Sequence, residues 1–172
     1  MRRPARDEEF SEYVGQRRVQ LRRMAYLLCG DVHRAEDLVQ TALLKLYVAW
    51  PRVQRAGNVD AYVRRILVNS GIDESRRPWR REEPGLDGVD RSTSDAGIED
   101  RSAVMDALAQ LPPGQRRVVV LRHFVGMSVE ETAADLQCSV GTVKSQSSRA
   151  LARLNELLTA QFRAVGGRDR DR

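Results

Sequence analysis

The chain has 172 residues, enough for one domain or for two small ones. Its 29 basic residues outnumber its 24 acidic ones, and the pI of about 9.7 suits a polyanionic partner. No apolar run is long enough to cross a membrane, and the amino-terminal segment lacks the apolar core of a signal peptide. The two cysteines, Cys29 and Cys138, are too isolated to form a disulfide framework. We therefore expect a soluble, cytoplasmic protein with no membrane contact.

Charge is distributed unevenly along the chain. Residues 1–80 carry 16 basic and 10 acidic side chains, residues 81–100 carry 2 and 7, and residues 101–172 carry 11 and 7. The basic residues are all Arg except Lys45 and Lys144. Because a guanidinium group can bind a phosphate or a guanine edge through two hydrogen bonds, this composition suits nucleic acid. The sequence predicts two basic modules joined by an acidic connector.

The first module begins with two predicted helices. One is expected over 7–28 and ends at Gly30 and Asp31. The next is expected over 33–50, and Pro51 is expected to stop it because proline has no amide hydrogen and clashes with the preceding turn. The predicted inward stripe of this second helix is Ala35, Leu38, Val39, Ala42, Leu43, Leu46, Ala49 and Trp50.

A loop over 52–57 is expected next, and Asn58 is placed to cap a third helix that reaches about Arg77. The residues predicted to point inward from this helix are Val59, Tyr62, Val63, Ile66 and Leu67. The opposite face carries Arg65, Asn69, Asp73 and Arg76.

Residues 78–97 contain two prolines, three glycines and little to bury, which is typical of a flexible linker. A second helical module is predicted over 98–162, with a break at Pro112 and Pro113 and a tail over 163–172 predicted to be disordered. Its central helix is predicted over 115–125, with Val118, Val119, Leu121 and Phe124 inward and Gly126 at its end. No segment has the alternation of a strand, so the expected fold class is all-α: two small helical modules, over 7–77 and 98–162, joined by a flexible acidic linker.

Residues 128–151 hold two capped amphipathic helices separated by a short turn, the pattern of a DNA-binding helix-turn-helix. Ser128 and Glu131 have capping-box spacing, Gln137 and Cys138 interrupt the period, and Ser139 is placed to cap a helix that starts at Val140. The predicted inward face of this last helix is Val140, Val143, Ala150, Leu151 and Leu154, and the outward face is Thr142, Lys144, Ser145, Ser148 and Arg149. A small, polar and basic outer face suits the major groove of double-stranded DNA.

No pattern indicates a catalytic or metal site. Cys29 and His33 are four residues apart, but no third ligand lies near them in the sequence. Residues 99–135 contain no acid–base pair, no glycine-rich phosphate loop and no nucleophile with a base partner. We therefore expect no enzyme activity, no metal and no cofactor.

Two parts of the chain resemble one known family. The run GDVHRAEDLVQTALLKLYVAW at 30–50, followed by VDAYVRRILVNSGIDESRR at 59–77, resembles region two of bacterial sigma factors of the extracytoplasmic-function group. The run LPPGQRRVVVLRHFVGMSVEETAADLQCSVGTVKSQSSRALARL at 111–154 resembles region four of the same group. The two matches occur in the family's order and at its spacing, and the segment AEDLVQTALLKLY is most like actinobacterial members.

The resemblance implies a protein that binds core RNA polymerase, recognises two promoter elements and helps to open the DNA. In the family, the second helix of region two binds the clamp coiled coil of the polymerase. The matching polar side chains here are Glu36, Asp37, Gln40 and Lys45. The family often has Glu after the Gln and an aromatic residue two positions later, where this chain has Thr41 and Leu43.

The resemblance also assigns residues to the promoter. For the minus-ten element it implies Arg55, Asn58, Tyr62, Arg65, Asn69, Asp73, Arg76 and Arg77, with Arg52, Gln54 and Gly57 as further members of the loop. For the minus-thirty-five element it implies Ser139, Thr142, Lys144, Ser145, Ser148 and Arg149. Arg116, Arg117 and Arg122 are candidates for contact with phosphates or with the polymerase flap. The acidic linker is expected to thread polymerase channels that later hold RNA, and an anti-sigma factor is a further implied partner.

Two other interpretations stay open at this point. A stand-alone helix-turn-helix regulator that binds an operator as a dimer accounts for residues 101–160 but leaves the first module without a role. An adaptor that uses its helices only for protein contacts supports no transcription from any promoter.

Overall fold

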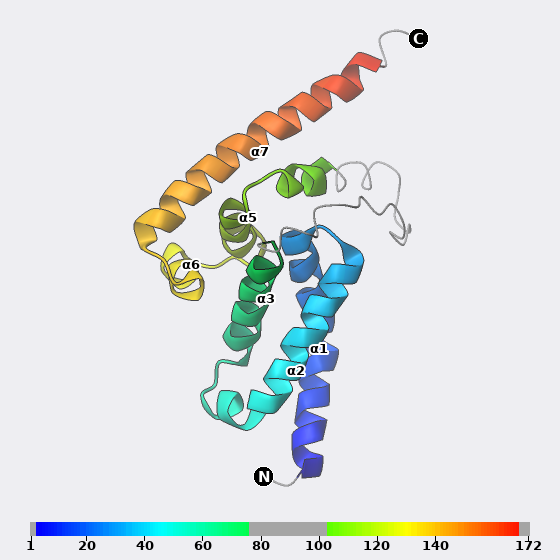
Figure 1. Cartoon of the computed structure of the whole chain (residues 1–172), viewed down its shortest axis with the longest axis vertical. Helices are drawn as coiled ribbons and strands as arrows, with labels where there is room; N and C mark the ends of the chain where they lie inside the picture. The colour runs from blue at the N-terminus through cyan, green and yellow to red at the C-terminus, as the bar shows by residue number, and fades with distance from the viewer. Residues whose placement is uncertain (1–2, 76–102, 169–172) are drawn as a thin grey trace. The chain divides into compact units, whose positions relative to one another are not determined.

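The computed structural model describes residues 3–75 and 103–168, and every regular element in these two ranges is a helix (Figure 1). The chain divides into two compact units, Met1–Gly85 and Leu86–Arg172. The all-α prediction is confirmed for the described ranges, and the linker predicted over 78–97 lies outside them. Across the same ranges, no helix has an apolar stretch that could cross a membrane.

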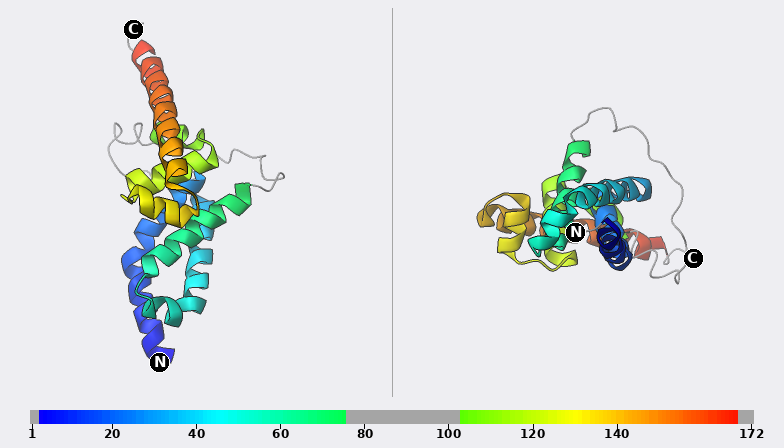
Figure 2. Two further views of the ribbon diagram at one scale, coloured as in Figure 1. Left: turned by 90° about the vertical axis from the view of Figure 1, so that its left-hand side faces the viewer. Right: turned by 90° about the horizontal axis from the view of Figure 1, so that it is seen from below.

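The first unit is built from α1 (Arg3–Cys29), α2 (Val32–Arg55) and α3 (Val59–Ser75). α1 and α2 lie side by side, and α3 contacts both (Figures 1 and 2). Between α1 and α2, Gly30 has a φ of 76°, a left-handed conformation that favours glycine. Asp31 then caps α2, because its carboxylate accepts a hydrogen bond from the Arg34 amide at 2.7 Å. The predicted break at Gly30 and Asp31 is confirmed.

One stripe along α2 forms the centre of the first core. Its buried members are Ala35, Leu38, Val39, Ala42, Leu46, Trp50 and Val53. α1 adds the buried side chains of Leu21, Met24 and Ala25, and α3 adds those of Val63, Leu67 and Val68. The predicted inward face of α2 is therefore confirmed, except that Leu43 and Ala49 are only half-buried.

α2 continues through Pro51, where the sequence predicted its end, and runs on to Arg55. A proline inside a helix deprives the carbonyl four residues earlier, here that of Tyr47, of its amide donor. The Arg6 guanidinium of α1 donates a hydrogen bond to this carbonyl, and its Cζ lies 4.4 Å from the centroid of the Tyr47 ring. A contact from a distant part of the chain thus supplies what the proline removes.

Ion pairs join α1 to α2 near the start of α2. Glu36 pairs with Arg18 and with Arg22, each at 2.8 Å between nitrogen and oxygen. The hydrogen bond from Arg18 lowers the pKa of the Glu36 carboxyl from its ordinary value of 4.5, and the Arg22 charge acts in the same direction against the effect of burial. The folded state therefore favours the ionised form of Glu36.

The second unit contains a helical segment over 103–109, α5 (Pro113–Val119), the π-helix η2 (Val120–Phe124), α6 (Val129–Leu136) and α7 (Val140–Arg168). α5 and α6 both contact α7. α7 extends past Phe162, where the sequence predicted that it would fade (Figure 1). The prediction of a disordered tail over 163–172 is thus wrong as far as Arg168, and residues 169–172 lie outside the described part.

The helix predicted over 115–125 changes its geometry within its length. The Val125 amide donates to the Val120 carbonyl at 3.0 Å, a bond that spans five residues instead of four. The wider turn changes the direction of the side chains that follow. Leu121 is buried as predicted, whereas Phe124, predicted inward, is 51% exposed. Gly126, with a φ of 82°, lies just beyond this turn, as the sequence predicted.

Leu46 and Leu44 form a matched pair for testing the core, because they share α2 and differ in burial. Leu46 is fully buried, whereas Leu44 is 66% exposed. Leu46→Ala should lower the free energy of unfolding by about 2–5 kcal/mol, because it removes buried apolar surface and leaves a cavity. Leu44→Ala should change it by less than about 0.5 kcal/mol. Urea unfolding followed by circular dichroism measures both, and equal losses would contradict the burial of the stripe.

Glu36→Gln should lower the free energy of unfolding near neutral pH by about 0.5–1 kcal/mol, because it removes one charge from two ion pairs. The folded state lowers the pKa of this carboxyl, so its contribution is present above the unfolded-state pKa and is lost as the pH falls through the folded-state pKa. The difference between the wild type and Glu36→Gln should therefore shrink between about pH 7 and about pH 3 in urea titrations. A difference that stays constant would show that the ion pairs do not stabilise the fold.

Candidate nucleic-acid and protein interfaces

The first helix of the helix-turn-helix begins with the capping box that the sequence predicted. The Glu131 amide donates to Ser128 Oγ at 3.0 Å, and the Ser128 amide donates to Glu131 Oε2 at 2.7 Å. Thr132 Oγ1 also donates to the Ser128 carbonyl at 2.8 Å and is buried. These bonds fix where α6 starts.

The turn between α6 and α7 has a defined geometry. Gln137 adopts the left-handed conformation with a φ of 53°, and the Cys138 amide bonds back to the Ala133 carbonyl at 3.0 Å, as in a Schellman motif. Ser139 then caps α7, because its Oγ accepts a hydrogen bond from the Thr142 amide at 3.0 Å. The predicted break and the predicted cap are both confirmed.

A small core sets the rotation of α7 about its own axis. Val143 is fully buried and clusters with Val118 of α5 and Ala133 of α6. Val129, Leu136, Cys138 and Val140 pack around this cluster. Leu151, predicted to point inward, is instead 44% exposed, so the buried face of α7 is narrower than expected.

The residues that the sequence assigned to the minus-thirty-five element are all exposed, with Ser139 at the cap of α7 and the others along the helix. They are Ser139, Thr142, Lys144, Ser145, Ser148 and Arg149. Three of these hydroxyls already make hydrogen bonds to their neighbours: Ser139 Oγ lies 2.8 Å from Thr142 Oγ1, and Ser145 Oγ donates to the Thr142 carbonyl at 3.0 Å. The face therefore combines partly satisfied hydroxyls with the cations of Lys144 and Arg149.

The arginines near α5 make bonds inside the second unit. Arg116 Nε donates to the Leu108 carbonyl at 2.7 Å and so binds the carboxyl end of the preceding helix. The Arg122 guanidinium donates to the Met127 carbonyl, and Arg117 Nε donates to that of Pro113 at 3.2 Å. The sequence suggested these side chains for phosphates or a partner protein, and the structure gives them bonds within their own unit.

The minus-ten candidates form a stripe along α3. Asn58, Tyr62, Arg65 and Asn69 follow helical spacing, and all are exposed except Tyr62, which is half-buried. Asp73 continues the same register on α3, but its side chain lies outside the described part, as do Arg76 and Arg77.

The predicted loop over 52–57 is shorter than expected, since α2 absorbs Arg52, Gln54 and Arg55. What remains is an exposed turn, 56–58, which we call the elbow, and Gly57 at its centre has a φ of 69°. Arg55, at the end of α2, is exposed, and its Nε donates to the Pro51 carbonyl at 2.7 Å.

The polymerase candidates on α2 divide into two groups. Asp37, Gln40 and Lys45 are exposed. Glu36 is held by two arginines of α1, and Gln40 also hydrogen-bonds to it. Glu36 therefore serves the packing of α1 on α2, a role that the sequence did not predict.

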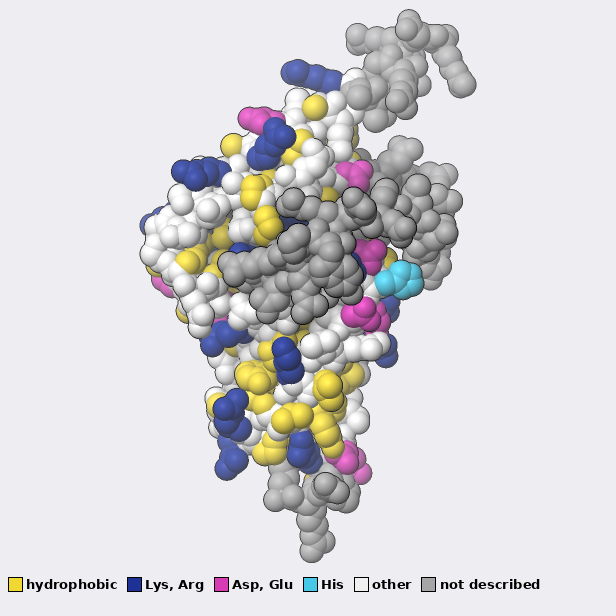
Figure 3. Space-filling view, in the orientation of Figure 1, with side chains coloured by type: hydrophobic (Ala, Val, Ile, Leu, Met, Phe, Trp, Pro, Cys, Tyr) yellow, Lys and Arg dark blue, Asp and Glu magenta, His cyan; other side chains and the backbone are white. Residues whose placement is uncertain are grey.

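Two exposed apolar residues on α2 were missed. Leu44 is 66% exposed and Val48 is 74% exposed, and their spacing of four residues places them on one side of the helix. Figure 3 shows hydrophobic side chains gathered over the carboxyl-terminal half of α2, with basic side chains beside them. The signal was available in the sequence, because both residues are apolar and fall outside the predicted inward stripe.

Comparison with known proteins identifies both units. The family model for sigma-70 region 2 matches residues 14–81, and the model for sigma-70 region 4 matches residues 101–154. A stand-alone helix-turn-helix regulator leaves the first of these matches unexplained. The function is that of a sigma factor, a transcription initiation factor without catalytic activity of its own.

Similar proteins cover nearly the whole chain. The RNA polymerase sigma-E factor of Streptomyces coelicolor is 44% identical over 170 residues, which cover 95% of this chain and 96% of that one. The factor SigM of Mycobacterium tuberculosis is 36% identical over 143 residues, covering 81% and 71%.

Solved structures agree with these matches. The sigma factor RpoE in complex with the anti-sigma factor NepR from Bartonella quintana aligns with a TM-score of 0.72 and 28% identity, covering 88% of this chain and 98% of that one. CnrH in complex with the cytosolic domain of CnrY aligns with a TM-score of 0.68 and 28% identity, covering 90% of both. The chain belongs to the extracytoplasmic-function group of RNA polymerase sigma factors.

Proposed function

We propose that this sigma factor divides its contacts among three helix faces. The outer face of α2 binds the clamp coiled coil of core polymerase, the stripe on α3 together with the elbow recognises the minus-ten element, and the outer face of α7 recognises the minus-thirty-five element. The observation that carries the proposal is the pairing of exposed helix faces with the two regions of the family: region 2 contains α2 and α3, and region 4 contains the capped α6–α7 pair.

The polymerase face is proposed to centre on Leu44 and Val48. Exposed apolar side chains on adjacent turns gain free energy when a partner helix covers them, at about 25 cal/mol for each Å² of apolar surface removed from water. Asp37, Gln40 and Lys45 lie on exposed positions of the same helix and supply polar contacts around that centre. An apolar centre with a polar surround is the usual composition of a protein interface.

For the minus-ten element, the proposed chemistry combines backbone and base contacts. Arg55 and Arg65 are exposed cations at the end of α2 and on α3, suited to phosphates. Asn58 and Asn69 present amides that can both donate and accept, as base edges require. The exposed elbow offers a place for a base that has left the stack, a step that costs a few kcal/mol and needs contacts in return.

For the minus-thirty-five element, α7 is proposed to enter the major groove. Thr142, Ser145 and Arg149 recur at the spacing of one helix face, and the amino-terminal residues of a recognition helix are those that reach the base edges. Lys144 and Arg149 add attraction to phosphates.

Further partners belong to the same proposal. Two of the similar solved structures are complexes with an anti-sigma factor or with a cytosolic partner domain, which supports an anti-sigma factor as a partner of this chain. The polymerase flap is the proposed contact of the second unit, and work with core polymerase implies a cytoplasmic location. The acidic residues of 81–100 suit a linker that occupies a channel built for nucleic acid.

The double substitution Leu44→Ala and Val48→Ala should weaken binding to core polymerase by about 30- to 100-fold, which corresponds to about 2–3 kcal/mol from two buried apolar contacts. Asp37→Arg should weaken it too, because the substitution inverts a charge on the same face. A competition assay against labelled wild-type chain measures both. The matched control is Val19→Ala, which removes an exposed apolar side chain from α1 and should leave the affinity unchanged. Equal affinity for the double variant and the control would refute the polymerase face.

Lys144→Ala and Arg149→Ala should each weaken upstream-element binding about fivefold to tenfold while leaving polymerase affinity intact, because each removes one charged DNA contact. Genomic fragments transcribed by reconstituted holoenzyme supply the promoter, and footprinting over its upstream element measures the effect. Arg153→Ala is the control, since Arg153 lies further along α7 and pairs with Glu156 at 3.1 Å. Footprints that weaken equally for all three variants would count against the proposed recognition face.

A further inference from the structure

The elbow between α2 and α3 is held on both sides by one helix, α1. On the α2 side, Arg6 donates to the Tyr47 carbonyl and stacks on its ring, and the Tyr47 hydroxyl donates to Asp7 at 2.8 Å. Closer to the elbow, Gln54 Nε2 donates to Glu9 Oε2 at 2.7 Å. These contacts, on both sides of Pro51, tie the last turns of α2 to the first turns of α1.

On the other side of the elbow, α1 holds the first turn of α3 through Asp60. The Tyr13 hydroxyl donates to Asp60 Oδ1 at 2.9 Å, and Arg17 Nη2 lies 2.9 Å from Asp60 Oδ2. Both carboxylate oxygens of Asp60 are therefore engaged. Burial raises the pKa of the Tyr13 hydroxyl, and the hydrogen bond to Asp60 and the negative charge of Asp60 raise it further. The hydroxyl therefore stays protonated and acts as the donor in this hydrogen bond.

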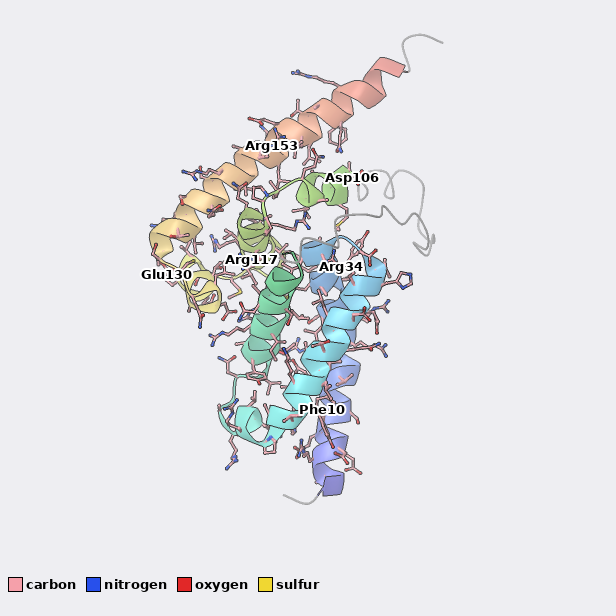
Figure 4. The ribbon with its side chains drawn as sticks, viewed as in Figure 1. Phe10, Arg34, Asp106, Arg117, Glu130 and Arg153 are labelled. Carbon is pink, nitrogen blue, oxygen red and sulfur yellow. The ribbon has the colours of Figure 1, made fainter. Side chains whose placement is uncertain are left out.

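An aromatic cluster connects the two sets of contacts. The Phe10 ring, labelled in Figure 4, lies edge-on to the rings of Tyr47 and Trp50 at centroid distances of 5.1 and 5.3 Å. The Tyr13 ring is tilted against Trp50 at 5.6 Å. Arg6, Phe10, Tyr13 and Arg17 thus follow one side of α1, at spacings of three or four residues.

The elbow itself is exposed at all of its residues, 56–58. Its direction is therefore set by the two helix ends that flank it, and α1 fixes both. A loop that is already held in its binding conformation loses less entropy when a ligand binds, so its affinity and selectivity are higher. This matters most where a base must leave the stack before it gains any contact.

We propose that Arg6, Tyr13 and Arg17 are positioning residues for recognition of the minus-ten element, acting through the Tyr47 carbonyl and Asp60. The inference rests on the proposed role of α3 and the elbow. It assigns to α1 a part in promoter selectivity without placing any residue of α1 on the DNA.

The test compares holoenzymes that contain the wild type, the double variant Tyr13→Phe with Arg17→Gln, and the control Arg23→Gln, an exposed arginine of the same helix. The probe is a fluorescent single-stranded oligonucleotide with the non-template minus-ten sequence of a promoter that the holoenzyme transcribes. A second probe has the same bases in scrambled order. The double variant should lose about tenfold of the native-to-scrambled affinity ratio, since two hydrogen bonds that hold the elbow are gone. Its affinities for the scrambled strand and for core polymerase should stay within about twofold of wild type.

A second measurement tests whether Tyr13 acts through Asp60. Tyr13→Phe keeps the ring on Trp50 and should lower the affinity ratio in the wild-type background but have no further effect in an Asp60→Ala background. Arg6→Gln provides an independent variant on the α2 side of the elbow and should lower the ratio as well.

An unchanged ratio for both the double variant and Arg6→Gln would overturn the proposal. Equal losses of affinity for the native strand, the scrambled strand and core polymerase would overturn it too, because they would show that the contacts only stabilise the fold. A wild-type holoenzyme that binds the two strands equally would overturn the proposed role of α3. This outcome can be told apart from failure of the positioning role, because it is measured without any variant.

Discussion

The buried stripe of α2 is the constraint on which the first unit depends. Leu38, Leu46 and Trp50 face inward and fill the core, and this fixes the rotation of α2 about its axis. The directions of the side chains between them are therefore fixed as well. Leu44 and Val48 are thereby left in water, where they favour association with a partner. The same stripe brings Trp50 against the aromatic residues of α1, and through them the elbow becomes tied to the amino-terminal helix.

In the second unit, a smaller core likewise fixes which side chains of a helix are exposed. The capping box and the left-handed Gln137 determine where α6 ends and α7 begins, and the fully buried Val143 fixes the rotation of α7. A helix held at its first turn in this way presents a constant set of side chains. Recognition of base edges requires such constancy, because a rotation of one residue would replace a hydroxyl by an apolar group.

The sequence predicted features that depend on neighbouring residues. The caps of the helix-turn-helix, the inward face of α2 and the exposed face of α7 all follow from short-range spacing. The errors arose where distant residues decide the outcome. Pro51 does not end α2 because Arg6 serves the carbonyl that it leaves without a donor. Phe124 points outward because a π-turn changes the helical period, and no residue pattern in the sequence signalled that turn. The sequence also did not reveal the ion pairs of Glu36, because its two arginines lie on another helix.

The face of α7 that we propose for the minus-thirty-five element offers few free hydrogen-bonding groups, and this bears on how the sigma factor selects promoters. Ser139 and Ser145 already bond to Thr142, so a base edge that binds these groups replaces existing hydrogen bonds and gains only about 1 kcal/mol for each exchange. Lys144 and Arg149 strengthen binding to any sequence. Under the proposed division of contacts, both DNA-binding faces belong to one holoenzyme. Once one face has bound its promoter element, binding of the other element is intramolecular, so the two modest sequence preferences multiply. Selectivity then requires that neither face bind tightly alone, because a tight face would hold the factor on DNA that lacks the other element.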